Sequence, residues 1–169
     1  NVQITRQVGA DHEWYEPQRY WRPKTDQWGT TSIETLAVAG DGAGIFGAEA
    51  AALAGKLAAL ETVHRAGKID ELQRDVEAGP LMREHNRIAG VRPLLDRLYH
   101  PAPEVLTPTD ETLVCRCEEV TAGDIRKCVE EGATGPNQLK AYTRCGMGPC
   151  QGRMCGLTVA EVIADARGK

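Results

Sequence analysis

All six cysteines lie between residues 115 and 155, five of them in two clusters, and this clustering constrains the fold of the chain more than any other feature. Thiolates gathered in this way bind Zn²⁺, Cu(I) or an iron–sulfur cluster. A segment of about 60 residues buries little apolar surface unaided, and a metal centre is a common remedy at this size. Glycines and arginines surround the cysteines, so we interpret the segment as an electron-transfer domain.

The composition excludes several classes of protein. A net charge of −4 over 169 residues argues against a protein that binds nucleic-acid backbones. No apolar run of about 18 residues is present to span a bilayer. Clustered cysteines fit a reducing compartment, so we expect a cytoplasmic protein, or one held at the inner membrane only through a complex. The chain starts at Asn1 without a signal peptide, so we expect part of a longer protein or a cleavage product.

Prolines mark a linker in the middle of the chain, between residues 101 and 108. We therefore expect two domains, one over residues 1–105 and one over residues 106–169. No internal repeat links the two.

The first domain is predicted to contain one buried strand and several helices. An apolar run that ends in glycine predicts a strand over residues 34–40. An alanine-rich segment with few charges predicts a helix over residues 45–66, buried on most sides. Two further helices are expected over residues 69–78 and 81–98, with Gly79-Pro80 separating them.

The second domain is predicted to be mostly helical. Thr121 and Asp124 resemble a capping box, with aspartate in the position of the usual glutamate, at the start of a helix over residues 122–131. Two further helices are expected over residues 137–142 and 152–166.

The cysteine spacing fits a [2Fe–2S] centre, which needs four converging thiolates with backbone N–H donors nearby. Cys115 and Cys117 form a Cys-x-Cys pair, and Cys150 and Cys155 form a Cys-x4-Cys pair after 32 intervening residues. Cys145 and Cys150 have the same x4 spacing, so spacing alone does not choose between the second pairs. A structural zinc ion in the same thiolates, or disulfide pairing, is the alternative.

Three segments resemble the bacterioferritin-associated-ferredoxin-like [2Fe–2S] domain: residues 115–121, 140–144 and 146–155. The resemblance covers residues 111–165 or so. It implies a [2Fe–2S] cluster with these ligands: Cys115, Cys117, Cys150 and Cys155. Cys128 lies on an apolar helix face and is interpreted as a small core residue.

Residues 31–41 resemble the C-terminal flavin motif of two-dinucleotide-binding-domain flavoproteins, in which an aspartate after the last strand binds the ribityl chain of FAD. By this resemblance the FAD-binding residues are Gly40, Asp41, Gly42, Gly44 and Ile45. The Gly-x-Gly-x-x-Gly fingerprint that cradles the pyrophosphate does not occur in the chain. The remainder of the FAD domain must therefore lie on a preceding segment or on another chain.

These resemblances together imply an α+β fold class: the C-terminal strand and helices of that flavoprotein fold, followed by a small, mostly helical [2Fe–2S] domain. Nearly the whole chain, including residues 3–7 and 21–23, resembles the A subunit of opine oxidases, the B subunit of hydrogen cyanide synthase and the α subunit of heteromeric proline or hydroxyproline dehydrogenases.

This wider resemblance implies an electron-relay subunit of an FAD- and [2Fe–2S]-dependent oxidoreductase complex that acts on CH–NH donors. Its partner would be a substrate-oxidising flavoprotein subunit, so no catalytic residue is assigned to this chain. The alternative is a stand-alone cluster- or zinc-binding module with a docking or regulatory role and no catalysis.

Overall fold

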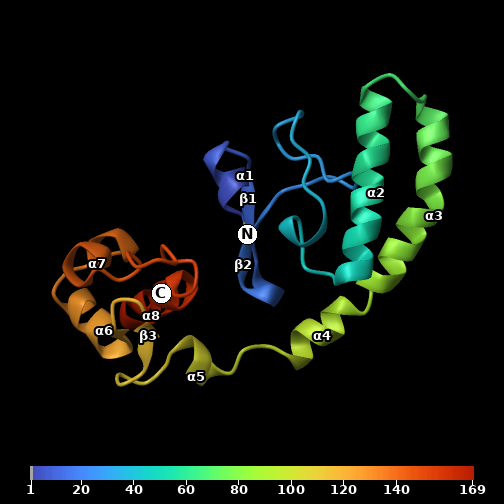
Figure 1. Ribbon diagram of the computed structural model, residues 1–169. Helices are drawn as coiled ribbons and strands as arrows, with labels where there is room; N and C mark the ends of the chain where they lie inside the picture. Colours follow the sequence, from blue (N-terminus) through green and yellow to red (C-terminus); the bar gives the residue numbers. More distant parts are fainter. Residues whose placement is uncertain (1) are drawn as a thin grey trace. The chain divides into compact units, whose positions relative to one another are not determined.

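The computed structural model describes residues 2–169, and the chain divides into two compact units, Asn1–His100 and Pro101–Lys169 (Figure 1). The division falls a few residues before the predicted position. The reason is that the short helix α5 (Pro103–Leu106) contacts α8 (Gly156–Ala166) and so belongs to the second unit.

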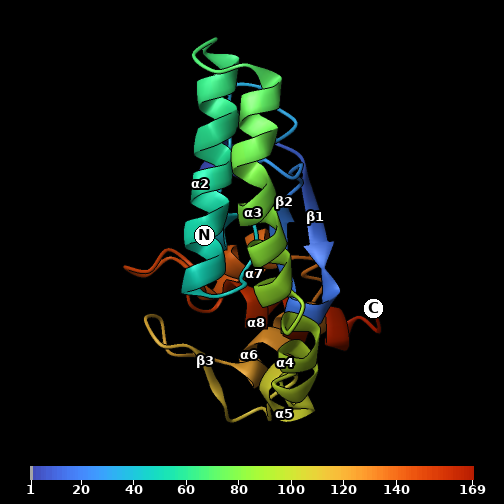
Figure 2. The ribbon, with the colours of Figure 1, turned by 90° about the vertical axis from the view of Figure 1, so that its right-hand side faces the viewer.

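Two long helices, α2 (Ala48–Arg65) and α3 (Glu71–Ala89), pack side by side in the first unit (Figures 1 and 2). Trp28, Leu57 and Ala78 are buried in the core of this unit. The prediction that α2 is buried on most sides is wrong: its buried residues follow one face, Ala50, Leu53, Leu57 and Glu61, while Glu49, Lys56 and Val63 are exposed. Packing against a single neighbouring helix covers only one side of α2.

The predicted break at Gly79-Pro80 is wrong, because α3 runs through Pro80. An internal proline removes one helix hydrogen bond and costs about 3 kcal/mol. Ala78, two residues before it, is only 1% exposed, so packing within the unit holds the helix together across the proline. The break comes at Gly90, and the next helix is α4 (Arg92–Leu98).

The predicted strand over residues 34–40 is also wrong. Its one strand-like pairing is an isolated bridge between Thr30 and Ala37, and a 3-10 turn, η2 (Gly40–Gly42), follows. A buried parallel strand needs neighbouring strands for its backbone hydrogen bonds. Over residues 2–169 the sheets are two antiparallel pairs, so the flavoprotein part of the predicted fold is not visible in this chain.

The first of these pairs is a hairpin of β1 (His12–Tyr15) and β2 (Tyr20–Pro23), preceded by helix α1 (Gln3–Gln7). Trp14 pairs with Trp21 across the hairpin, and their ring centroids lie 5.9 Å apart.

A 3-10 turn, η1 (Glu16–Gln18), joins the two strands and packs on α4. Gln18 donates hydrogen bonds of 3.2 Å to the buried carboxylate of Asp96. Arg92 pairs with the same carboxylate at 2.5 Å. These contacts fix the hairpin to the helical part of the first unit.

A buried carboxylate links α2 to α3. Glu61 is only 8% exposed, and its two oxygens accept hydrogen bonds from Arg65 at 2.7 Å and from Arg74 at 2.9 Å. Burial acts to raise the pKa of Glu61, but the two arginines outweigh it and hold that pKa below its usual value. Arg74 also lies over the ring of Trp28, 4.5 Å from its centroid.

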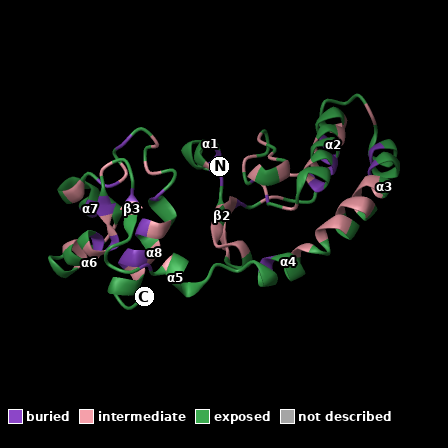
Figure 3. Cartoon of the chain, turned by 60° about the horizontal axis from the view of Figure 1, so that its bottom comes forward, coloured by how far each residue is buried: buried purple, intermediate pink, exposed green. Residues whose placement is uncertain are grey.

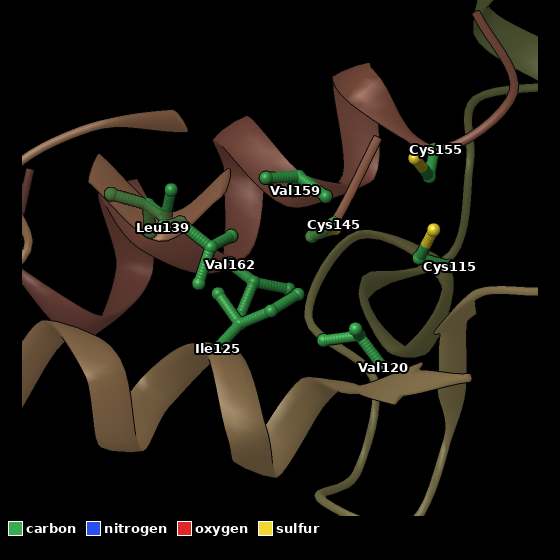
Figure 4. Packing of buried hydrophobic residues seen from close by; sticks show 9 residues of the cluster. Cys115, Val120, Ile125, Leu139, Cys145, Cys155, Val159 and Val162 are labelled. Atoms are coloured by element: carbon green, nitrogen blue, oxygen red, sulfur yellow. The ribbon is translucent and has the colours of Figure 1, made fainter. Parts of the chain in front are cut away.

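The second unit contains three longer helices: α6 (Ala122–Glu130), α7 (Pro136–Thr143) and α8. Its buried residues lie on these helices and on the segments around the cysteines (Figure 3). Ile125, Leu139 and Val162 are fully buried there (Figure 4).

The predicted helices of this unit match the structure closely, except that α8 begins at Gly156 instead of Gly152. The predicted capping box is confirmed at the start of α6. Thr121 accepts a hydrogen bond from the backbone N–H of Asp124 at 3.2 Å, and Asp124 accepts one in return at 3.0 Å. Within the described part of the chain, no helix has the length and apolar character needed to cross a membrane.

Candidate metal centre

The four cysteines predicted as ligands line a single hollow of about 640 Å³ in the second unit: Cys115, Cys117, Cys150 and Cys155. Two loops supply them. The first joins β3 (Leu113–Cys115) to β4 (Val120–Thr121), and the second joins α7 to α8. The structure therefore brings together residues that are up to 40 positions apart in the sequence.

Two of these thiols are buried. Cys115 ends β3 and is 1% exposed, and Cys155 precedes the first turn of α8 and is 4% exposed. Their sulfur atoms lie within 4.8 Å of each other, and Figure 4 shows the two side chains next to one another. We call Cys115 and Cys155 the inner pair.

The other two thiols are more accessible. Cys117 is exposed and Cys150 is half-buried, both line the hollow, and Cys117 contributes to a lowered pKa of Cys150. We call Cys117 and Cys150 the outer pair. Two adjacent sulfur pairs around one hollow match what a [2Fe–2S] cluster requires, because each of its two irons takes two thiolates.

Backbone N–H groups point at sulfur in both pairs. The N–H of Gly146 lies 3.5 Å from the sulfur of Cys115, and the N–H of Glu118 donates to the same atom. Burial acts to raise the pKa of Cys115, but these N–H donors outweigh it, and the pKa lies below its ordinary value. Such donors stabilise the negative charge of thiolate ligands.

Cys150 receives similar help from the turn that precedes α8. The N–H of Met154 contributes most to lowering the pKa of Cys150, and the N–H groups of Gly152 and Arg153 add to the effect. The turn at residues 152–155, where a longer α8 was predicted, therefore supplies N–H groups to the sulfur of Cys150.

Gly148 lies against Cys117 so closely that no other residue fits. A Cβ atom at Gly148 would lie 2.1 Å from the Cβ of Cys117 and 2.9 Å from its sulfur. The second cysteine loop therefore approaches the first at the position of an outer sulfur, and a side chain at residue 148 would separate them.

Cys145 is a fifth thiol at the same place. It is 5% exposed, and its sulfur lies within 4.8 Å of the sulfurs of both Cys115 and Cys155. Burial raises the pKa of Cys145 to about 12, with a further contribution from the charge of the neighbouring thiols. The remaining cysteine, Cys128, is half-buried on α6 and packs against the core, and burial raises its pKa as well.

Glu118 takes part in the site although the sequence pattern did not single it out. Its N–H donates to Cys115, and its carboxylate accepts a hydrogen bond of 3.0 Å from Arg144. It thus ties the first cysteine loop to the start of the second. Only its position directly after Cys117 could have pointed to this role.

The predicted flavin residues lie in the first unit, around η2. Gly40 and Gly44 line a cavity of about 330 Å³, together with Trp28 and residues of α2 and α3, whereas Asp41 and Ile45 are exposed. The sheets over residues 2–169 do not form the parallel sheet of a dinucleotide fold, and the pyrophosphate fingerprint is missing from the sequence. These residues therefore do not make an FAD site by themselves.

Comparison with known proteins identifies a domain in the second half of the chain. Residues 113–165 match the BFD-like [2Fe-2S] binding domain. The A subunit of anaerobic glycerol-3-phosphate dehydrogenase from Escherichia coli is 42% identical over 53 residues, which make up 31% of this chain and 10% of the relative. No solved structure matches the chain.

Two groups of relatives match nearly the whole chain. The A subunit of opine oxidase from Rhizobium meliloti is 44% identical over 163 residues, or 96% of this chain and 35% of the relative. The HcnB subunit of hydrogen cyanide synthase from Pseudomonas aeruginosa is 36% identical over 174 residues, or 99% of this chain and 36% of the relative. The chain spans about a third of the length of these curated relatives. It is therefore a homologue, over nearly all of its residues, of the opine oxidase A and hydrogen cyanide synthase HcnB subunits, and it carries a BFD-like [2Fe–2S] binding domain.

Proposed function

We propose that this chain is part of an electron-relay subunit of a heteromeric, FAD-dependent amino-acid or opine oxidase or dehydrogenase. The observation that carries the proposal is the convergence of four thiols on one hollow, with backbone N–H groups near the sulfurs of Cys115 and Cys150. Relatives named as subunits of opine oxidase and hydrogen cyanide synthase support it. The substrate class, CH–NH donors, is part of the proposal.

Within this proposal, Cys115, Cys117, Cys150 and Cys155 hold a [2Fe–2S] cluster. Such a cluster, when bound, carries one electron at a time. The residues of this chain supply its environment. The N–H groups of Gly146 and Glu118 offset charge on the inner side, and the core of the unit keeps water from the inner pair.

The first unit, in this proposal, contributes the last part of an FAD domain. Asp41 would accept a hydrogen bond from the ribityl chain, with Gly40, Gly42, Gly44 and Ile45 next to the flavin. A preceding segment or another chain would supply the remainder of the FAD domain, and a partner flavoprotein subunit would oxidise the substrate. We place the complex in the cytoplasm, because six free cysteines suit a reducing compartment.

The ligand assignment is tested by replacing each cysteine with serine and measuring iron, acid-labile sulfide and the visible spectrum of anaerobically purified protein. Serine at any ligand position should abolish or alter the spectrum, because an oxygen replaces a soft sulfur ligand. Cys145→Ser should leave it nearly intact. Loss of iron from Cys145→Ser, together with an unchanged spectrum in Cys155→Ser, would show that Cys145 is the ligand instead.

Gly148→Ala tests whether the two cysteine loops must touch. The added methyl group would lie within 2.1 Å of the Cβ of Cys117, so the loops must separate. We expect the iron content to fall by about tenfold or more, as for other residues that support metal ligands. Gly156→Ala is the matched control, because a Cβ there meets nothing within 4 Å. Equal iron in both variants, with circular dichroism unchanged, would refute the role of Gly148.

Asp41→Ala tests the flavin assignment in the whole protein. Because a hydrogen bond to a charged group is worth roughly 1.5–3 kcal/mol, FAD retention should weaken by about tenfold or more. Asp165→Ala, at an exposed position on α8, is the control. Unchanged FAD affinity in Asp41→Ala, measured by equilibrium dialysis of the whole protein, would count against the motif.

The relay itself is tested in the complete complex, with an opine or amino-acid substrate and a quinone analogue as the acceptor. Substrate should reduce the iron centre, as followed by electron paramagnetic resonance. In a Cys117→Ser complex that lacks iron, flavin reduction by substrate should persist while turnover with the quinone falls sharply. Full quinone turnover in a complex shown to lack iron would make the metal centre structural and overturn the relay.

A further inference from the structure

The candidate site contains five thiols, one more than a [2Fe–2S] cluster uses. The extra sulfur has a definite place. Cys115, Cys145 and Cys155 are all buried, and their sulfur atoms all lie within 4.8 Å of one another. Three soft donors at this separation are themselves a potential metal site, and the ligand assignment uses only two of them.

The fold of the second cysteine loop explains why Cys145 and Cys155 meet. Each lies five residues from Cys150, on opposite sides of it. Gly146 and Gly152 both have a left-handed backbone, with φ of +82° and +75°, and this turns the loop back on itself.

The two arms then touch at these glycines. A Cβ at Gly146 would lie 3.5 Å from the Cα of Gly152, so the backbones are in contact there. Cys145 directly precedes Gly146, and Cys155 follows Gly152 by three positions. The contact between the two glycines therefore brings both cysteines next to Cys115.

We propose that Cys145 is a reserve ligand, able to take the place of Cys155 beside Cys115 on the inner side of the cluster. The proposal rests on the ligand set assigned under the proposed function. Substitution requires the Cys145 thiol to release its proton to solvent and form an iron–sulfur bond in place of the bond from Cys155. Because the two sulfurs are already neighbours, the exchange needs a side-chain movement and leaves the helices in place.

The reserve role is confined to the inner pair. The sulfur of Cys150 lies outside the three-thiol group among the described residues. Cys145 is also shielded, at 5% exposure, whereas Cys117 is exposed. The arrangement would let the centre keep its iron when the bond from Cys155 is lost.

The test compares two matched pairs of variants of the full chain, purified anaerobically: Cys155→Ala against Cys145→Ala/Cys155→Ala, and Cys150→Ala against Cys145→Ala/Cys150→Ala. Alanine is used because it offers no oxygen as a substitute ligand. Iron, sulfide and the electron paramagnetic resonance spectrum of the reduced protein are measured for each, with circular dichroism to confirm folding.

We expect Cys155→Ala to retain iron with an altered spectrum, and the Cys145→Ala/Cys155→Ala protein to hold about tenfold less iron. The Cys150 pair should show no such difference. Equal iron in Cys155→Ala and its double variant would overturn the reserve role. The ligand assignment would survive that result, because wild type and Cys145→Ala would still hold iron. A wild-type protein without iron would instead overturn the ligand assignment and the reserve role with it. If the double variant does not fold, Cys145→Val/Cys155→Ala gives the same comparison with a residue that fills the space and offers no ligand atom.

Discussion

The second unit depends on holding several thiols within a few ångströms of one another in a small fold. Ionised sulfurs at that distance repel each other, and the raised pKa values of Cys145 and Cys155 reflect burial together with the charge of Cys115. A bound metal centre removes this conflict, because its positive charge pairs with the thiolates and its binding energy becomes folding energy. The apolar core is modest, and its buried residues include three of the cysteines.

Much of the local structure serves to bring the two cysteine loops together. The capping box at Thr121 starts α6 directly after the first loop, and the turn before α8 supplies N–H groups to Cys150. Gly148 allows the loops to touch, and the pair between Glu118 and Arg144 fixes them from the side. Each device acts over a short stretch of chain, and together they produce one hollow lined by four thiols.

The second unit was predictable from the sequence because its signals are local. Capping residues, apolar spacing and turn glycines fix α6 and α7 without reference to distant partners. The place of Cys145 was not predictable, because it depends on how two left-handed glycines fold the loop back. In the first unit, the run at residues 34–40 has the pattern of a strand but no neighbouring strands to pair with. The helix α3 continues across Pro80 against local propensity, because packing around Ala78 stabilises it there.

The proposed relay requires the second unit to bind an iron–sulfur cluster, and this chain is sufficient to test that. The most direct measurement is the visible absorption spectrum of the wild-type chain purified anaerobically, with iron, zinc and acid-labile sulfide determined on the same sample. We predict broad bands that dithionite bleaches, with iron and sulfide in equal amounts. A colourless protein that contains zinc and no sulfide would contradict the account.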